Sequence, residues 1–168
     1  PISDEKQEAM LQRQIDDLEM AIQSARYEQD GGRYTVKQIE KTRKTLQTRL
    51  EKLNQKEKKD QVVTFEELGV DHLYVDEAHS YKNAFLYTKM RNVAGIAQNE
   101  AQKSADMFNK CQYLDEITGG KGITFATGTP ISNSMTELYV MQRYLQNSKL
   151  QNMGLGLFDS WASTFGEV

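Results

Sequence analysis

The chain has 168 residues, which suits one domain of ordinary size, and 27% of them are charged, which favours a small core joined to a long solvated element. Its formal net charge of −3 at pH 7 excludes a global basic field, so any contact with nucleic acid has to be local. A single cysteine and two histidines exclude an internal disulfide, a cysteine-based zinc cluster and a histidine-rich metal site.

The sequence contains no apolar run long enough to span a bilayer and no signal peptide. We therefore expect no membrane partner and a cytoplasmic location. The chain begins at Pro1 without a methionine and stops at Val168, so we expect it to be a piece of a longer protein. The one cysteine, Cys111, has no histidine or basic cluster near it in sequence, which favours a buried, inert thiol.

Residues 1–60 are predicted to form an arm of two antiparallel helices. Residues 4–60 lack proline and carry two apolar runs whose members are spaced alternately by four and three residues, as in a coiled coil. The first run is Leu11, Ile15, Leu18, Ile22 and Ala25, and the second is Val36, Ile39, Leu46, Leu50 and Leu53, with Arg43 at one position of the seam.

Residues 29–33, with two glycines, predict the turn between these helices. The charged flanks indicate a projecting arm, which serves either as a spacer or as a surface for nucleic acid or a partner. Since an isolated two-helix arm is only marginally stable, we expect it to be able to pair with a second copy of itself.

Residues 61–168 are predicted to form an α/β unit with a parallel sheet. A capping box at Thr64 and Glu67 predicts a helix start. Apolar runs predict buried strands at residues 72–75 and 122–126, and apolar periodicity predicts helices at residues 100–117 and 134–146. Strand, helix, strand, helix is the rhythm of a parallel α/β sheet. Two strands alone do not make a stable sheet.

The first candidate site follows the first strand, where residues 76–79 read Asp-Glu-Ala-His. A carboxylate at the carboxyl end of a buried strand lies at the edge where such sheets bind ligands, and it can hold a magnesium ion on phosphates. The adjacent carboxylate can polarise an attacking water. Taken alone, the two acids could equally begin a helix, where negative charge suits the dipole.

The second candidate site follows the second strand, where residues 126–130 read Ala-Thr-Gly-Thr-Pro. Small hydroxylated residues and a glycine let the backbone turn tightly. In isolation, a plain strand-to-helix connection with Thr129 or Ser132 as the helix cap is the better reading.

Together, the two motifs closely resemble those of superfamily II helicases, and within them those of Swi/Snf-type DNA translocases. In that family the DEAH-like box is followed by Lys-Asn, here Lys82 and Asn83, and the Thr-Gly-Thr-Pro box by Asn, here Asn133, and then by Glu-Leu, here at residues 137–138. The aromatic residues beyond match that family's tail: Phe158, Trp161 and Phe165.

The resemblance covers residues 62–92 and 121–166 but not the hairpin. Large helicase–methylase proteins of phages and mobile elements look similar in both boxes. The fold that the resemblance implies is the distal part of the first RecA-like P-loop NTPase lobe, with few parallel strands and flanking helices. The cofactors it implies are ATP and Mg²⁺. The partners it implies are double-stranded DNA and a second RecA-like lobe of the same chain.

The resemblance also implies roles for individual residues. Asp76 would bind Mg²⁺ through water, Glu77 would be the general base for hydrolysis, and His79 would link the nucleotide site to the nucleic-acid site. The motif that couples hydrolysis to movement would include Thr127, Gly128 and Thr129. Without the resemblance, a helix cap or a satisfied core residue is the better interpretation of His79.

The phosphate-binding loop Gly-x-x-x-x-Gly-Lys-Ser/Thr does not occur in the sequence. Residues 119–122, Gly-Gly-Lys-Gly, lack its spacing and predict a turn. Without that loop there is no amide cradle and no lysine for the β- and γ-phosphates. We therefore expect the longer protein to hydrolyse ATP and this chain to be inactive alone.

Two alternatives remain open from the sequence. One is a coiled-coil interaction module carried on a degenerate ATPase scaffold, against which the presence of both Asp76 and Glu77 argues. The other is a helicase that separates strands of RNA or DNA, because unwinding and translocation use the same motor.

Overall fold

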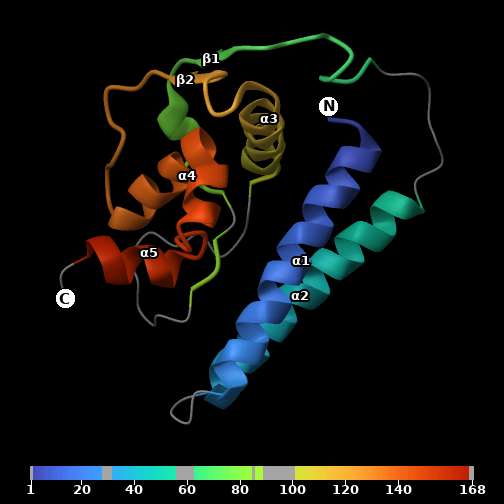
Figure 1. Cartoon of the computed structure of the whole chain (residues 1–168), viewed down its shortest axis with the longest axis vertical. Helices are drawn as coiled ribbons and strands as arrows, with labels where there is room; N and C mark the ends of the chain where they lie inside the picture. Colours follow the sequence, from blue (N-terminus) through green and yellow to red (C-terminus); the bar gives the residue numbers. More distant parts are fainter. Residues whose placement is uncertain (1, 28–31, 56–62, 85, 89–100, 167–168) are drawn as a thin grey trace. The chain divides into compact units, whose positions relative to one another are not determined.

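The computed structural model describes residues 2–27, 32–55, 63–84, 86–88 and 101–166 (Figure 1). The chain divides into two compact units, Pro1–Glu67 and Leu68–Val168. No helix in the described parts is both long and apolar enough to cross a membrane.

The first unit consists of helices α1 (Asp4–Tyr27) and α2 (Gly32–Asn54), which lie side by side (Figure 1). Two ion pairs show that they run antiparallel: Arg26 contacts Glu40 at 3.2 Å, and Arg43 contacts Glu19 at 3.0 Å. The predicted hairpin is therefore present. Arg43, the charged residue in the otherwise apolar seam of α2, pairs with Glu19 of α1.

The apolar seam is buried largely as predicted, but it is wider on α1. Met10 and Ala21, which the four-three spacing omits, are as buried as the seam residues around them. On α2, Ile39 and Leu46 are fully buried, whereas Leu50 is only half-buried. The predicted turn is wrong at residues 32 and 33, which already belong to α2; residues 29–31 lie outside the described ones.

The capping box at Thr64 and Glu67 forms, but it closes a turn and not a helix. The Thr64 amide donates to Glu67 Oε2 at 2.7 Å, and the Glu67 amide donates to Thr64 Oγ1 at 3.4 Å. Residues 65–69 are turns, ended by Gly69 with a φ of 65°. The prediction of the capping box is therefore confirmed, whereas the prediction that a helix starts there is wrong, because no apolar helical face follows the box.

The described part of the second unit contains two short parallel strands, β1 (Leu73–Val75) and β2 (Ile123–Phe125). They are in register, with Leu73 opposite Ile123 and Val75 opposite Phe125. A helix, α3 (Gln102–Thr118), lies between them in sequence, as parallel strands require. Over its described residues the chain is thus mostly helical with two parallel strands, in agreement with a partial α/β fold.

One face of this sheet meets a core formed by α3, α4 (Met135–Asn152) and α5 (Phe158–Phe165). Aromatic side chains supply much of its volume, and its buried members are Ala84, Phe108, Cys111, Tyr139, Val140, Tyr144, Leu150, Leu155, Phe158 and Trp161. Burial raises the pKa of the Cys111 thiol to about 12, with a smaller contribution from Asp115, so this thiol is inert as expected.

Helix α4 differs from its predicted bounds and cap. It continues past residue 146 through a kink at Gln146, whose φ is −155° and ψ is 44°. The Asp115 carboxylate of α3 accepts the Ser148 amide at 2.9 Å just beyond the kink. The cap is Ser134, whose Oγ accepts the Thr136 amide at 3.0 Å, and not Thr129 or Ser132.

Candidate functional site

The two sequence motifs leave the sheet at the same edge. Beyond the strands, the Ala126 amide donates to Val75 O at 2.8 Å and the Ala78 amide donates to Ala126 O at 3.1 Å. These bonds extend the pairing of β1 and β2 by one step into the motifs. The Asp-Glu-Ala-His residues and the Thr-Gly-Thr-Pro residues therefore start side by side.

Asp76 and Glu77 are exposed and form a strained turn directly after β1. Glu77 has φ 51° and ψ 44°, the left-handed region, which costs an L-residue roughly 1–2 kcal/mol. Among the described non-glycine residues it is the one with a positive φ. Asp76 Oδ1 accepts the Glu77 amide at 2.9 Å and so supports this turn. Strain of this kind is concentrated at functional sites.

A short 3-10 helix, η1 (Ala78–Tyr81), carries His79 and is fixed at both ends. Ala78 is fully buried, and its amide bonds to Ala126 O. At the other end, the Tyr144 hydroxyl donates from the core to Tyr81 O at 2.8 Å. The backbone on which His79 stands is thus held by the sheet and by α4.

His79 joins the two motifs. Its Nδ1 lies 3.0 Å from Thr127 Oγ1 and 3.2 Å from Glu77 Oε2. The contact with Thr127 suits either tautomer of the ring, with Nδ1 or the hydroxyl as the donor. The His79 side chain is 43% exposed, so it is not a buried core histidine, and it lies inside η1, whose cap residues are Glu77 and Lys82. Thr127 Oγ1 also accepts the Thr129 amide at 3.2 Å.

Gly128 lies at a bend of the backbone, as the sequence predicts, and the Thr129 amide bonds back to Thr127 Oγ1 across it. Gly128 is exposed, its φ is not positive, and a Cβ at this position would have no atom within 4 Å. In this chain, neither backbone conformation nor packing requires a glycine there. Glycine also allows a ligand or another backbone to approach closely, which is the role left open for it.

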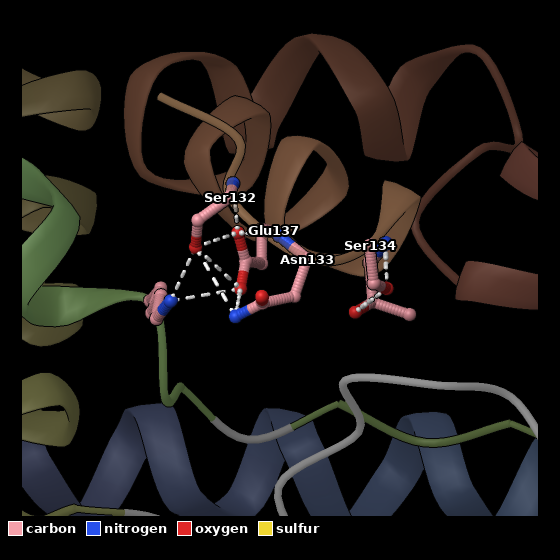
Figure 2. A network of polar contacts seen from close by, with 6 residues as sticks. Ser132, Asn133, Ser134 and Glu137 are labelled. Atoms are coloured by element: carbon pink, nitrogen blue, oxygen red, sulfur yellow. Dashed lines mark hydrogen bonds and ion pairs between the residues drawn. The ribbon is translucent and has the colours of Figure 1, made fainter. Parts of the chain in front are cut away.

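Behind these motifs lies a polar network centred on Glu137, whose role the sequence did not reveal (Figure 2). Its carboxylate accepts the Ser132 amide at 2.6 Å, the Asn133 amide at 3.2 Å and the Lys82 ammonium at 2.9 Å. Lys82 also donates to Ser132 Oγ at 2.7 Å. The sequence offered one signal for it, because Lys82, Asn133 and Glu137 are among the residues that carry the family resemblance.

The charge of Glu137 is stabilised although the residue is only 5% exposed. Burial alone would raise the pKa of this carboxyl group. The Ser132 amide, Lys82 and the Ser132 hydroxyl outweigh burial, and they lower the pKa to about 2. Glu137 is therefore ionised over the whole physiological pH range. Its carboxylate binds Lys82, Ser132 and Asn133, which follow the two motifs.

The described residues contain no cluster of three or more histidine, cysteine, aspartate or glutamate side chains suited to hold a metal ion. Asp76 contributes one exposed carboxylate at the edge of the sheet. Mg²⁺ commonly keeps several waters and takes one or two carboxylates together with phosphate oxygens. A single exposed carboxylate such as that of Asp76 fits this mode of binding. It does not fit a site in which protein side chains supply all the ligands.

Comparison with known proteins gives this chain a family. A family model described as a probable helicase domain matches residues 1–168. Over 117 residues the chain is 31% identical to the protein named Defense against restriction protein B of Escherichia phage P1. That match covers 67% of this chain and only 5% of the phage protein. No solved structure matches the chain significantly.

Proposed function

Because this chain belongs to the family of probable helicase domains, we propose that it forms the catalytic part of the first RecA-like lobe of an ATP-dependent DNA translocase of the Swi/Snf kind. One observation carries the proposal: the two motifs leave neighbouring parallel strands at one edge and meet through His79 and Thr127. The carboxyl edge of a parallel sheet is where α/β proteins bind nucleotides.

In this proposal, each residue acts from its place at that edge. Asp76 holds Mg²⁺ through water, and bound Mg²⁺ neutralises charge on the terminal phosphates. Glu77 takes the proton from the attacking water. His79 and Thr127 pass the state of the nucleotide site to the Thr127–Thr129 loop, which faces nucleic acid and the second lobe.

The phosphate-binding loop belongs to another part of a longer polypeptide, since this sequence lacks the motif. The similarity to a small share of a long phage protein supports that arrangement. This chain alone then binds Mg-ATP weakly and does not turn it over. The arginine that completes the site comes from the second lobe.

The test is ATP hydrolysis by the longer polypeptide, measured without nucleic acid and with duplex DNA, single-stranded DNA or duplex RNA. Stimulation by duplex DNA without strand separation supports a translocase. Stimulation accompanied by strand separation supports the helicase alternative, and the absence of hydrolysis contradicts the proposal. Calorimetry of this chain with Mg-ATP should show no binding in the micromolar range.

A further inference from the structure

We propose that Glu137 is a positioning residue, which holds the loop after β2 in register with the residues after β1 through Lys82. The inference rests on the proposed function and deepens it, because it names a residue that aligns the two motifs without touching nucleotide. The geometry of the Glu137 network separates this role from ordinary helix capping.

Glu137 occupies the third position of α4, where a capping box would use it differently. In that motif the glutamate accepts the amide of the cap residue itself, which here is Ser134. The Glu137 carboxylate instead accepts the amides of Ser132 and Asn133, which precede the cap (Figure 2). It therefore fixes the loop ahead of the helix, and Ser134 caps the helix without it.

Lys82 turns this local contact into a connection between motifs. It is the first residue after η1, and its ammonium group reaches both Glu137 Oε1, at 2.9 Å, and Ser132 Oγ, at 2.7 Å. Its side chain is 29% exposed and that of Glu137 is 6% exposed, so solvent screens the pair only in part. One buried carboxylate thus receives donors from both segments.

The loop after β2 is held at two places. At its start, Ala126 pairs with β1 and Thr127 contacts His79. At its end, the Glu137 network holds residues 132 and 133. Residues 128–131 between these places are exposed. Loss of the second attachment should let the loop shift relative to His79 while the sheet and the core stay intact.

The first test is amide hydrogen exchange of this chain. In Glu137→Gln the amides of Ser132 and Asn133 should exchange about tenfold faster than in the wild type, because a charged acceptor is lost. Lys82→Met, the second variant, should also speed the exchange of these amides. Lys82→Arg keeps a charged donor and should keep their exchange slow. The matched control is Asp106→Asn, which breaks the Asp106–Lys110 ion pair of α3 and should leave both amides unchanged.

The second test is nucleic-acid-stimulated ATP hydrolysis by the longer polypeptide. Glu137→Gln and Lys82→Met should each lower the stimulated kcat by about tenfold to a hundredfold, as loss of alignment does, with the KM for ATP unchanged. The double variant should be no worse than either single one. If the role of Glu137 were purely structural, Glu137→Gln would lower the melting temperature of the protein. The stimulated kcat of the folded variant would then equal that of the wild type.

The outcomes separate this inference from the proposed function. Unchanged exchange at Ser132 and Asn133 in Glu137→Gln overturns the inference, whatever the enzyme does. Wild-type stimulation in folded Glu137→Gln overturns it as well. A wild-type polypeptide that does not hydrolyse ATP overturns the proposed function and, with it, the role of Glu137 in that reaction.

Discussion

Nδ1 of His79 lies 3.0 Å from Oγ1 of Thr127, so a side-chain hydrogen bond joins the Asp-Glu-Ala-His residues after β1 to the Thr-Gly-Thr-Pro residues after β2. The same nitrogen lies 3.2 Å from Oε2 of Glu77. A change in the partner of Glu77, such as the arrival of a water or a phosphate, would therefore alter the bond to Thr127.

Thr127→Val should lower the nucleic-acid-stimulated ATPase activity of the longer polypeptide while leaving ATP binding unchanged. Valine keeps the shape but cannot bond to His79 or accept the Thr129 amide. We expect a loss of about tenfold, and steady-state kinetics would measure it. The control is Thr124→Val on β2, which removes a 3.0 Å contact with His72 outside the site and should have no effect.

Gly128→Ala should leave the fold intact and impair function. Because φ is not positive and a Cβ would meet no atom within 4 Å, alanine should stabilise the chain by about 0.4–1 kcal/mol through the unfolded state. Thermal denaturation and stimulated hydrolysis would be compared. Gly122→Ala is the opposite case, since its Cβ would lie 2.8 Å from Asp71 O and should destabilise the chain by about 1–3 kcal/mol. Full activity in Gly128→Ala would remove any need for close approach there.

Glu137 should make the second unit sensitive to acid. Its pKa is lowered from 4.5 to about 2 in the folded chain, so its stabilisation is complete above pH 4.5 and is lost as the pH falls through about 2. At about 1.4 kcal/mol per pKa unit, the contribution is on the order of 3–4 kcal/mol. Urea unfolding between pH 6 and 2 should show a shallower pH dependence in Glu137→Gln. Equal slopes would contradict the assignment.

Removal of residues 4–60 from the longer polypeptide, with the ends joined, should spare basal ATP hydrolysis. The hairpin carries no residue of the site, and the chain divides into two units near its end. Stimulation by DNA or by a partner is the property that the arm could alter. If a folded deletion variant loses basal hydrolysis, the arm is part of the motor and the assignment is wrong.

The elements that local pattern determines were predictable from the sequence, and those set by distant partners were not. The seam of the hairpin, β1, β2 and the start of α4 follow from apolar spacing and turn residues. The kink at Gln146 did not, because the Asp115 carboxylate beyond it comes from another helix. Ile117 and Met135 lie in the helices that apolar periodicity predicts, yet both are exposed, because periodicity alone does not say which apolar residues find a partner.

The candidate site shows the same division. Asp76, Glu77 and His79 were identified from their place after a strand and from the family resemblance. The left-handed backbone of Glu77 and the network of Glu137 were not, since each depends on contacts that sequence spacing does not encode. Glu137 lies 55 residues from Lys82 in sequence, and only the parallel pairing of the strands brings the two together.

The most direct test of the account is steady-state ATP hydrolysis by the longer polypeptide carrying Glu77→Gln, with Glu51→Gln on the exposed face of α2 as the control. The amide keeps the shape of the side chain but cannot take a proton from water, so turnover should fall by about 10²–10⁴ while ATP binding persists. The control should hydrolyse ATP as the wild type does. Turnover of Glu77→Gln within about threefold of the wild type would contradict the role of Glu77 as the base, and with it the proposed catalytic site.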